Sequence, residues 1–174
     1  DDLLTLYSHD DEYSLYHRFT TDLQARWEVD DEGDVTDLLG IDISVEDGHV
    51  CLRQGAYIRR LAADWLPDGV PATMQKNGTP CLPELPQQVL DAVSSEEAPD
   101  LELTRRYQSL VGAMLYCATN TRPDIAFAVS MLGRAMSCPN EELLERARRV
   151  LRYLRAHRDV GLRYSAADRS ALSG

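Results

Sequence analysis

The chain has 174 residues, 44% hydrophobic residues and a formal net charge of −11. This length allows one domain or two small subdomains, and the hydrophobic content is sufficient for a packed core. No apolar run is long enough to cross a bilayer, and the acidic start does not resemble a signal peptide. Because the chain begins at Asp1 rather than Met, we expect an excised or processed piece.

The charge is distributed unevenly along the chain. Residues 1–100 hold six basic and 22 acidic side chains, whereas residues 101–164 hold eleven basic and six acidic ones. Such asymmetry indicates an interaction surface on the second half, despite the negative total. All but one of the basic residues are arginines, which contact phosphate in a forked geometry, although an arginine-rich coding bias would give the same composition.

The four cysteines, Cys51, Cys81, Cys117 and Cys138, are widely spaced and form no CxxC pair. This spacing argues against a zinc site, and apolar neighbours favour buried free thiols in a reducing compartment over disulfides.

The first part of the chain predicts a strand and a helix. The apolar run 3–7 is typical of a buried strand, and Ser8 to Asp11 reads as a capping box. The helix that follows is expected to end near Val29. Its apolar face is formed by Leu15, Phe19 and Leu23.

A β-hairpin is predicted next. Apolar and polar residues alternate over 41–46, and Asp47-Gly48 is a strong signal for a two-residue turn. A turn of this length fixes the register of the strands. The expected cross-strand pairs are Val45 with Val50, Ile43 with Leu52, and Asp42 with Arg53 as an opposite-charge pair.

Helix and loop patterns follow the hairpin. A helix over 54–65 is predicted to bury Tyr57, Ile58 and Leu61. Six of the eight prolines fall within 66–103, which predicts a crossing loop or linker with a short helix around 87–93.

The last third of the chain predicts three helices and a closing strand over 159–164. The second of these helices is expected to start at Thr121 as N-cap, with Pro123 in its first turn and Asp124 as the capping partner. The third is expected over 141–157, after a break at Pro139-Asn140. The predicted inward residues are Tyr107, Leu110, Val111, Met114, Leu115 and Ala118 in the first helix, Ile125, Ala128, Val129, Leu132 and Met136 in the second, and Leu143, Ala147, Val150, Leu151 and Leu154 in the third.

Two sets of charged residues are candidates for function. Adjacent carboxylates such as Asp1 and Asp2 beside a strand can bind Mg²⁺, although acids at a chain end are usually just solvated. Arg148, Arg149, Arg152 and Arg155 lie opposite the apolar stripe of the third helix, flanked by Arg146. Such a row suits a phosphate backbone, but it is also compatible with a solvated face paired with Glu142 and Glu145.

Several segments, in order and through essentially the whole chain, resemble the reverse transcriptase of copia-type retrotransposons. The strongest runs are Tyr107 to Gly112, Leu115-Tyr116, Thr121 to Ser130, and Arg149 to Leu154. Shorter ones are Asp1 to Leu4, which resembles the end of the Tyr-x-Asp-Asp turn, Leu39 to Ile43, the helix with Gln54, Tyr57-Ile58 and Leu61, Thr79-Pro80, Met136-Ser137, Pro139 and Gly161 to Tyr164.

The resemblance implies roles for these segments. Asp1 and Asp2 would be catalytic metal ligands for Mg²⁺, and Leu39, Gly40 and Ile41 would line the primer grip. The helices after Gln54 would form a thumb that holds an RNA or DNA template–primer duplex, and the complete enzyme would use dNTPs. The chain would be part of a Pol polyprotein, in a cytoplasmic virus-like particle or the nucleus.

We therefore expect an α+β fragment, with a palm remnant and β-hairpin followed by a mostly helical thumb-like bundle. The expected parts are a palm remnant with its hairpin and first helix over 1–65, a proline-rich linker over 66–103, a three-helix segment with a closing strand over 104–164, and a polar tail over 165–174. The Tyr-x before the aspartates, the earlier palm aspartate and the RNase H domain of the family lie outside the chain, so we expect the isolated fragment to be inactive. The alternatives are a stand-alone nucleic-acid-binding module and a co-opted protein-interaction scaffold.

Overall fold

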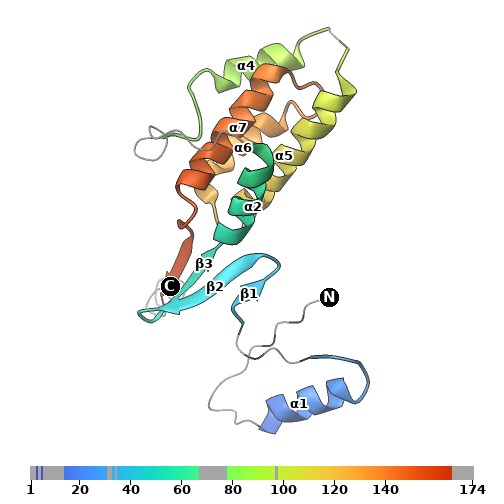
Figure 1. The fold of residues 1–174 in the computed structure, drawn as a ribbon, viewed down its shortest axis with the longest axis vertical. Helices are drawn as coiled ribbons and strands as arrows, with labels where there is room; N and C mark the ends of the chain where they lie inside the picture. The colour runs from blue at the N-terminus through green and yellow to red at the C-terminus, as the bar shows by residue number, and fades with distance from the viewer. Residues whose placement is uncertain are drawn as a thin grey trace, which may run out of the picture. The chain divides into compact units, whose positions relative to one another are not determined.

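The computed structural model describes residues 3, 5, 14–30, 33, 35–66, 78–96 and 98–165. The chain forms two units, 1–39 and 40–174, drawn in Figure 1. The described elements combine helices with antiparallel strands, so the predicted α+β class is confirmed. The capping box over Ser8–Asp11, most of the first predicted strand and the tail after Ser165 lie outside the described residues.

The first unit contains helix α1 (Ser14–Gln24) and the two-residue strand β1 (Asp37–Leu38). The helix ends earlier than the expected Val29, because the N–H groups of Arg26 and Trp27 both turn back to the carbonyl of Leu23. The expected apolar face is present but open, since Leu15 is 58% and Phe19 is 44% exposed.

The second unit begins with the predicted hairpin, made of strands β2 (Ile41–Glu46) and β3 (His49–Arg53). The register is confirmed: Val45 lies opposite Val50, Ile43 opposite Leu52 and Asp42 opposite Arg53. Asp47 and Gly48 have φ angles of 50° and 74°, which match a two-residue turn that needs positive φ at both positions. The predicted closing strand is β4 (Leu162–Ser165), which pairs antiparallel with β3.

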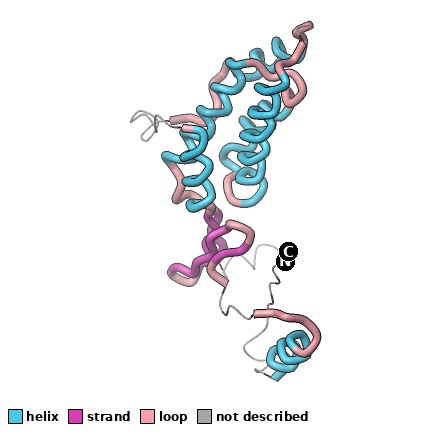
Figure 2. The backbone as a smooth tube through the Cα atoms, turned by 45° about the vertical axis from the view of Figure 1, so that its right-hand side comes forward, coloured by secondary structure: helices cyan, strands magenta, loops and turns pink. Residues whose placement is uncertain are grey.

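The helices of the second unit pack into one bundle, with strands β2, β3 and β4 at one of its ends (Figure 2). They are α2 (Gly55–Trp65), α4 (Leu85–Val93), α5 (Leu101–Asn120), the short 3₁₀ helix η2 (Pro123–Ile125), α6 (Ala126–Gly133) and α7 (Glu141–Ala156). Helix α7 contacts α2, α4, α5 and α6, so it is the central element of the bundle.

The predicted apolar stripe of α7 is confirmed. Every inward residue predicted for α7 is fully buried, and so is Ile125 at the start of the second predicted helix. Asn140 caps α7, since its side chain accepts a hydrogen bond of 2.9 Å from the Leu143 N–H. In α5 the prediction is wrong at Leu115, which is 47% exposed because it lies about 100° around the helix from the buried Met114.

The proline-rich segment after Trp65 contains more packed structure than a linker needs. Helix α4 starts two residues before the expected helix and has Pro86 in its first turn. Leu85, Val89 and Ala92 lie in the core, where α4 packs against α6 and α7. Among the described helices, none combines the length and apolar character that a membrane crossing requires.

Candidate nucleic-acid interface

The expected metal ligands, Asp1 and Asp2, lie outside the described residues. Within the part of the chain that the structure describes, no group of three or more histidines, cysteines and acids is placed to hold a metal ion. The expectation of a Mg²⁺ site therefore depends on the sequence resemblance.

The expected primer-grip residues form the turn that leads into β2. Leu39 and Gly40 have φ angles of 54° and 78°, and Ile41 is the first residue of β2. Glycine adopts positive φ without steric cost, but a leucine there is an unusual, strained conformation of the kind that is concentrated at functional sites. The Leu39 side chain is 68% exposed, so this turn presents an apolar side chain to solvent.

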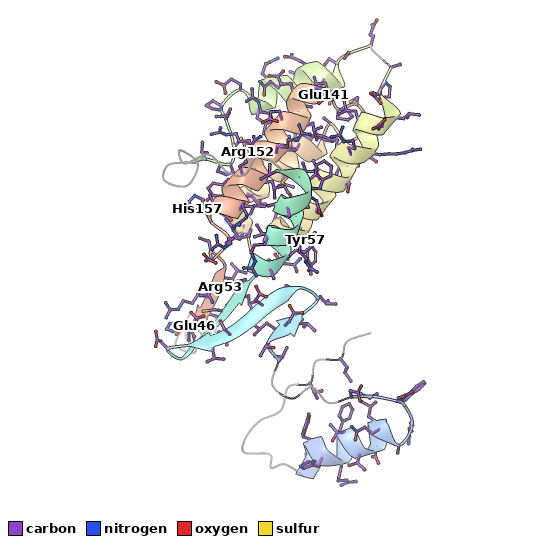
Figure 3. The ribbon with its side chains drawn as sticks, in the orientation of Figure 1. Glu46, Arg53, Tyr57, Glu141, Arg152 and His157 are labelled. Atoms are coloured by element: carbon purple, nitrogen blue, oxygen red, sulfur yellow. The ribbon has the colours of Figure 1, made fainter. Side chains whose placement is uncertain are left out.

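The polar face of the hairpin has a different charge pair from the one predicted. Arg53 lies opposite Asp42, but it binds Glu46 further along β2, with distances of 2.6 Å and 2.9 Å from its two terminal nitrogens to the carboxylate oxygens. Figure 3 shows both side chains on the hairpin. The arginine side chain is long enough to pass Ser44, whose hydroxyl oxygen accepts a third hydrogen bond at 3.1 Å.

This forked contact affects the ionisation of the hairpin carboxylate. Hydrogen bonds from Arg53 and Ser44 lower the pKa of Glu46 to about 2 and outweigh the opposing effect of desolvation. The pair is at the surface, where such contacts contribute little to stability. It holds the Arg53 guanidinium against its own hairpin, so this charge is not free for a phosphate.

The arginines of α7 divide into paired and unpaired ones. Glu145 accepts from Arg152 at 2.5 Å and lies 3.6 Å from Arg148. Arg146 binds Glu142 at 3.3 Å and donates through Nε to Gln88 of α4 at 2.8 Å. The alternative interpretation, a face paired at helical spacing, is thus confirmed for these three arginines.

The other two arginines of the row are not committed to carboxylates. Arg149 has a buried Nε without a hydrogen-bond partner among the described residues. Arg155, in the last turn of α7, forms no ion pair within the same part of the chain. On α2, which packs against α7, Arg59 and Arg60 are exposed and form no ion pair with any described residue. Sequence analysis did not select these two, because a pair of arginines on a short helix carries no distinctive pattern.

A polar cluster with a buried centre lies where the strands pass into the helices: Gln54, Thr121 and Arg122 are buried, His157 is half-buried and the Asp124 side chain is 31% exposed. We call it the joint cluster, and its members are Gln54, Thr121, Arg122, Asp124 and His157. Arg122 is 0% exposed. Its guanidinium donates to the two Asp124 carboxylate oxygens at 3.0 Å and 2.7 Å and to the His157 carbonyl at 2.9 Å.

Thr121 has another role than the predicted N-cap. Its hydroxyl donates to Oε1 of the fully buried Gln54 at 2.7 Å, and its backbone ends α5. The chain then forms the 3₁₀ helix η2 before α6 starts, so the expected continuous helix from Pro123 is interrupted. Asp124 partners Arg122 instead of closing a capping box.

The electrostatics of the joint cluster favour an ionised carboxylate. Burial would raise the pKa of Asp124, but hydrogen bonds from Arg122 and its charge outweigh this and hold the pKa below the usual 3.8. The Tyr153 ring lies 5.7 Å from the Arg122 guanidinium carbon, and burial together with the Asp124 carboxylate raises the pKa of its hydroxyl. Sequence reasoning missed that Arg122 is structural. The sequence signal for this structural role was an arginine two residues before an aspartate, between two strongly apolar helices.

Comparison with known proteins places this arrangement in context. The chain is 32% identical to the putative transposon Ty5-1 protein of Saccharomyces cerevisiae over 91% of its own length and 49% of that protein. It is 32% identical to the Pol polyprotein from transposon RE1 of Arabidopsis thaliana over 81% of the chain and 9% of the polyprotein. It is 39% identical to the Pol polyprotein from transposon TNT 1-94 of Nicotiana tabacum over 36% of the chain and 5% of the polyprotein.

These relatives are retrotransposon Pol polyproteins and Ty-related proteins, and the chain is homologous to a segment of them. It spans about half the length of the yeast relative and a small part of the plant polyproteins. No protein-family model matches the chain, and no solved structure matches it significantly.

Proposed function

We propose that this segment of a retrotransposon Pol polyprotein belongs to its reverse transcriptase, where it supplies the primer grip and helices that hold the template–primer duplex. The observation that carries the proposal is the homology to Pol polyproteins over most of the chain, on a fold in which a hairpin leads directly into a helical bundle. The family resemblance implies the same order along the chain, a primer grip followed by a thumb.

The hairpin would position the primer. The Leu39-Gly40 turn combines a strained backbone with an exposed apolar side chain, which suits contact with the sugar and base of a primer end. In this role Leu39, Gly40 and Ile41 would hold the 3′-hydroxyl in line with the α-phosphate of an incoming dNTP. Such positioning lowers the barrier without any chemistry by these residues.

Helices α2 and α7 would hold the duplex, through arginines that have no carboxylate partner among the described residues. Arg59 and Arg60 on α2 and Arg155 on α7 meet this criterion. Arg148 and Arg152 would contribute less, because Glu145 neutralises part of their charge. Phosphate contacts of this type release counterions and give affinity that falls steeply with salt.

Asp1 and Asp2 would supply two of the hard oxygen ligands that Mg²⁺ prefers. The metal, when bound in the complete enzyme, stabilises charge that develops during phosphoryl transfer. The resemblance places a further catalytic aspartate upstream of this segment, so we expect the isolated chain to bind a duplex without extending a primer. In the cell the complete protein would act in a cytoplasmic virus-like particle or the nucleus.

Binding of a labelled RNA–DNA hybrid to the 174-residue chain tests this function. Fluorescence anisotropy should show binding at low salt and a steep loss of affinity as salt rises. Replacing Arg59, Arg60 and Arg155 together by Gln should reduce the slope of log K against log salt by about 0.9 for each phosphate that is no longer neutralised. The matched control is Arg105→Gln, at an exposed and likewise unpaired site among the described residues that lies on α5 and not on the α2–α7 pair, so it should leave the slope unchanged. No binding at low salt, or a slope that ignores the triple substitution, would contradict the proposal.

A further inference from the structure

The strands and helices of the second unit meet at two chain junctions. β3 passes into α2 at Gln54, and α7 passes into β4 through residues 157–161. Elsewhere the two layers touch little: among the described elements, α2 and β2 are the one helix–strand pair in more than marginal contact. The angle between the β2–β3–β4 sheet and the bundle therefore depends on what holds these junctions.

We propose that the joint cluster is a positioning device that fixes this angle. Two adjacent residues between α5 and α6 reach both junctions at once. Thr121 donates to Gln54 at the β3–α2 junction, and Arg122 donates to the His157 carbonyl at the α7–β4 junction. Both contacts connect residues far apart in the sequence, so they restrain the junctions relative to the centre of the bundle.

The geometry of Arg122 makes the restraint directional. Its planar guanidinium binds Asp124 through two parallel hydrogen bonds, which orients the third donor toward His157. The Arg122 side chain is fully buried, so its donors are shielded from solvent, whereas the Asp124 carboxylate that accepts two of them is 31% exposed. A lysine has the same charge but a single ammonium on a flexible stem, and it cannot reproduce the fork.

The two junctions are also fastened to each other. Arg53 Nε donates to the Asp159 carbonyl at 3.2 Å. A Cβ atom added at Gly161 would lie 2.1 Å from the Leu52 carbonyl oxygen and 2.8 Å from Arg53 Cγ, so only glycine permits this close approach. The junctions therefore move as one body, and the joint cluster fixes that body to α5 and α6.

The angle between the sheet and the bundle determines whether one duplex can contact both of them at once. This step rests on the proposed function. A duplex held by the turn that leads into β2 and by the helices binds the second of these surfaces at an effective concentration set by the geometry between them. Loosening the joint would lower that effective concentration while leaving every residue that touches the duplex intact. The joint cluster thus contributes to affinity without touching the duplex.

Two measurements on the 174-residue chain test the proposal, with Arg122→Lys as the main variant and Arg105→Lys on α5 as the charge-matched control. The first is amide hydrogen exchange. In R122K the amides of β4 should exchange about tenfold faster, whereas those of the α5 interior change less than about twofold, because the joint opens locally. The second is the Kd for an RNA–DNA hybrid, which should rise about tenfold through the lower effective concentration.

Each outcome decides the proposal. Faster exchange in β4 and α5 together would show that Arg122 supports the fold in general, and this would overturn it. A loosened β4 with an unchanged Kd would also overturn it. If the unsubstituted chain binds no duplex, the proposed function fails. The hydrogen-exchange data alone then decide whether the joint cluster fixes the angle between the sheet and the bundle. If R122K does not fold, the milder variant Thr121→Val, which removes one hydrogen bond, takes its place. The proposal then expects faster amide exchange in β4 with little change in the interior of α5.

Discussion

Arg122 and Arg152 lie in the same unit in contrasting environments. Arg122 is fully buried and binds a carboxylate and a backbone carbonyl, whereas Arg152 lies at the surface of α7 beside Glu145. The segment with the strongest family resemblance thus contains a structural arginine, and the arginines selected for nucleic-acid binding are partly neutralised. Position on a helix face predicts exposure, but it does not predict which exposed charges are free.

The largest effect is expected from removing the buried arginine. Arg122→Met leaves the His157 carbonyl and the partly exposed Asp124 carboxylate without their donor and should lower the free energy of unfolding by about 2–3 kcal/mol through the lost charge-assisted hydrogen bonds. Arg152→Met removes a surface pair and should cost less than about 1 kcal/mol. Urea denaturation followed by circular dichroism measures both, with Arg105→Met as control. Equal losses of unfolding free energy in the two variants would contradict the assignment of Arg122 as a structural arginine and Arg152 as a surface one.

A second substitution tests the close approach beside the joint cluster. Gly161→Ala places a methyl group against the Leu52 carbonyl, so either β4 separates from β3 or the backbone shifts. Overpacking of this kind typically costs about 1–3 kcal/mol. The matched control is Gly112→Ala in α5, where an added Cβ meets nothing within 4 Å. We expect this helix glycine to gain stability on substitution by alanine, and urea titration would show opposite signs for the two variants.

Acid titration sharpens the comparison further. The pKa of Asp124 is lower in the folded state than its usual 3.8, so its stabilising contribution is complete above that value and is lost as the pH falls through the folded pKa. Glu46 also has a lowered pKa in the folded state, so its stabilising contribution is complete above its usual pKa of 4.5 and is lost as the pH falls toward the folded value of about 2. Unfolding free energies measured from neutral pH into acid should fall less steeply in Asp124→Asn than in the unsubstituted chain. Parallel curves for the two proteins would contradict the assigned ion pair.

The smallest effect on stability, with a visible effect on binding, is expected on α7. Glu145→Gln removes the partner of Arg148 and Arg152 and should change stability by less than about 1 kcal/mol. The two freed arginines should tighten duplex binding and steepen its salt dependence, with a slope change of about 0.9 for each additional phosphate neutralised. Glu102→Gln in the first turn of α5 controls for the change in net charge. A Glu145 variant that binds no better than this control would exclude α7 from the interface.

Local sequence rules predicted the parts that depend on neighbours in the chain. The hairpin register follows from alternation and the Asp47-Gly48 turn, and the buried face of α7 follows from its helical period. Both signals lie within a few residues, and tertiary packing did not oppose them. The existence of a helix within 87–93 was likewise predicted, with its start displaced by two residues.

The errors have a common physical cause. Thr121 satisfies a local capping rule, but its hydroxyl finds Gln54, which is 67 residues away in the chain. Arg53 has Asp42 directly opposite, yet its long side chain reaches the forked contact with Glu46. The arginines of α2, which form no ion pair with any residue that the structure describes, could not be distinguished from paired ones, because pairing depends on the packing of helices that sequence pattern alone does not place.

The buried thiol of Cys117 can report on local opening of the helical bundle. Cys117 is 0% exposed, and burial raises the pKa of its thiol to about 11, so an alkylating reagent at neutral pH meets neither an accessible sulfur nor a thiolate. Modification at this position therefore records each excursion in which α5 leaves the core. Peptide mapping that separates the label at Cys117 from label at Cys51, Cys81 and Cys138 would follow this opening over time in the unsubstituted chain.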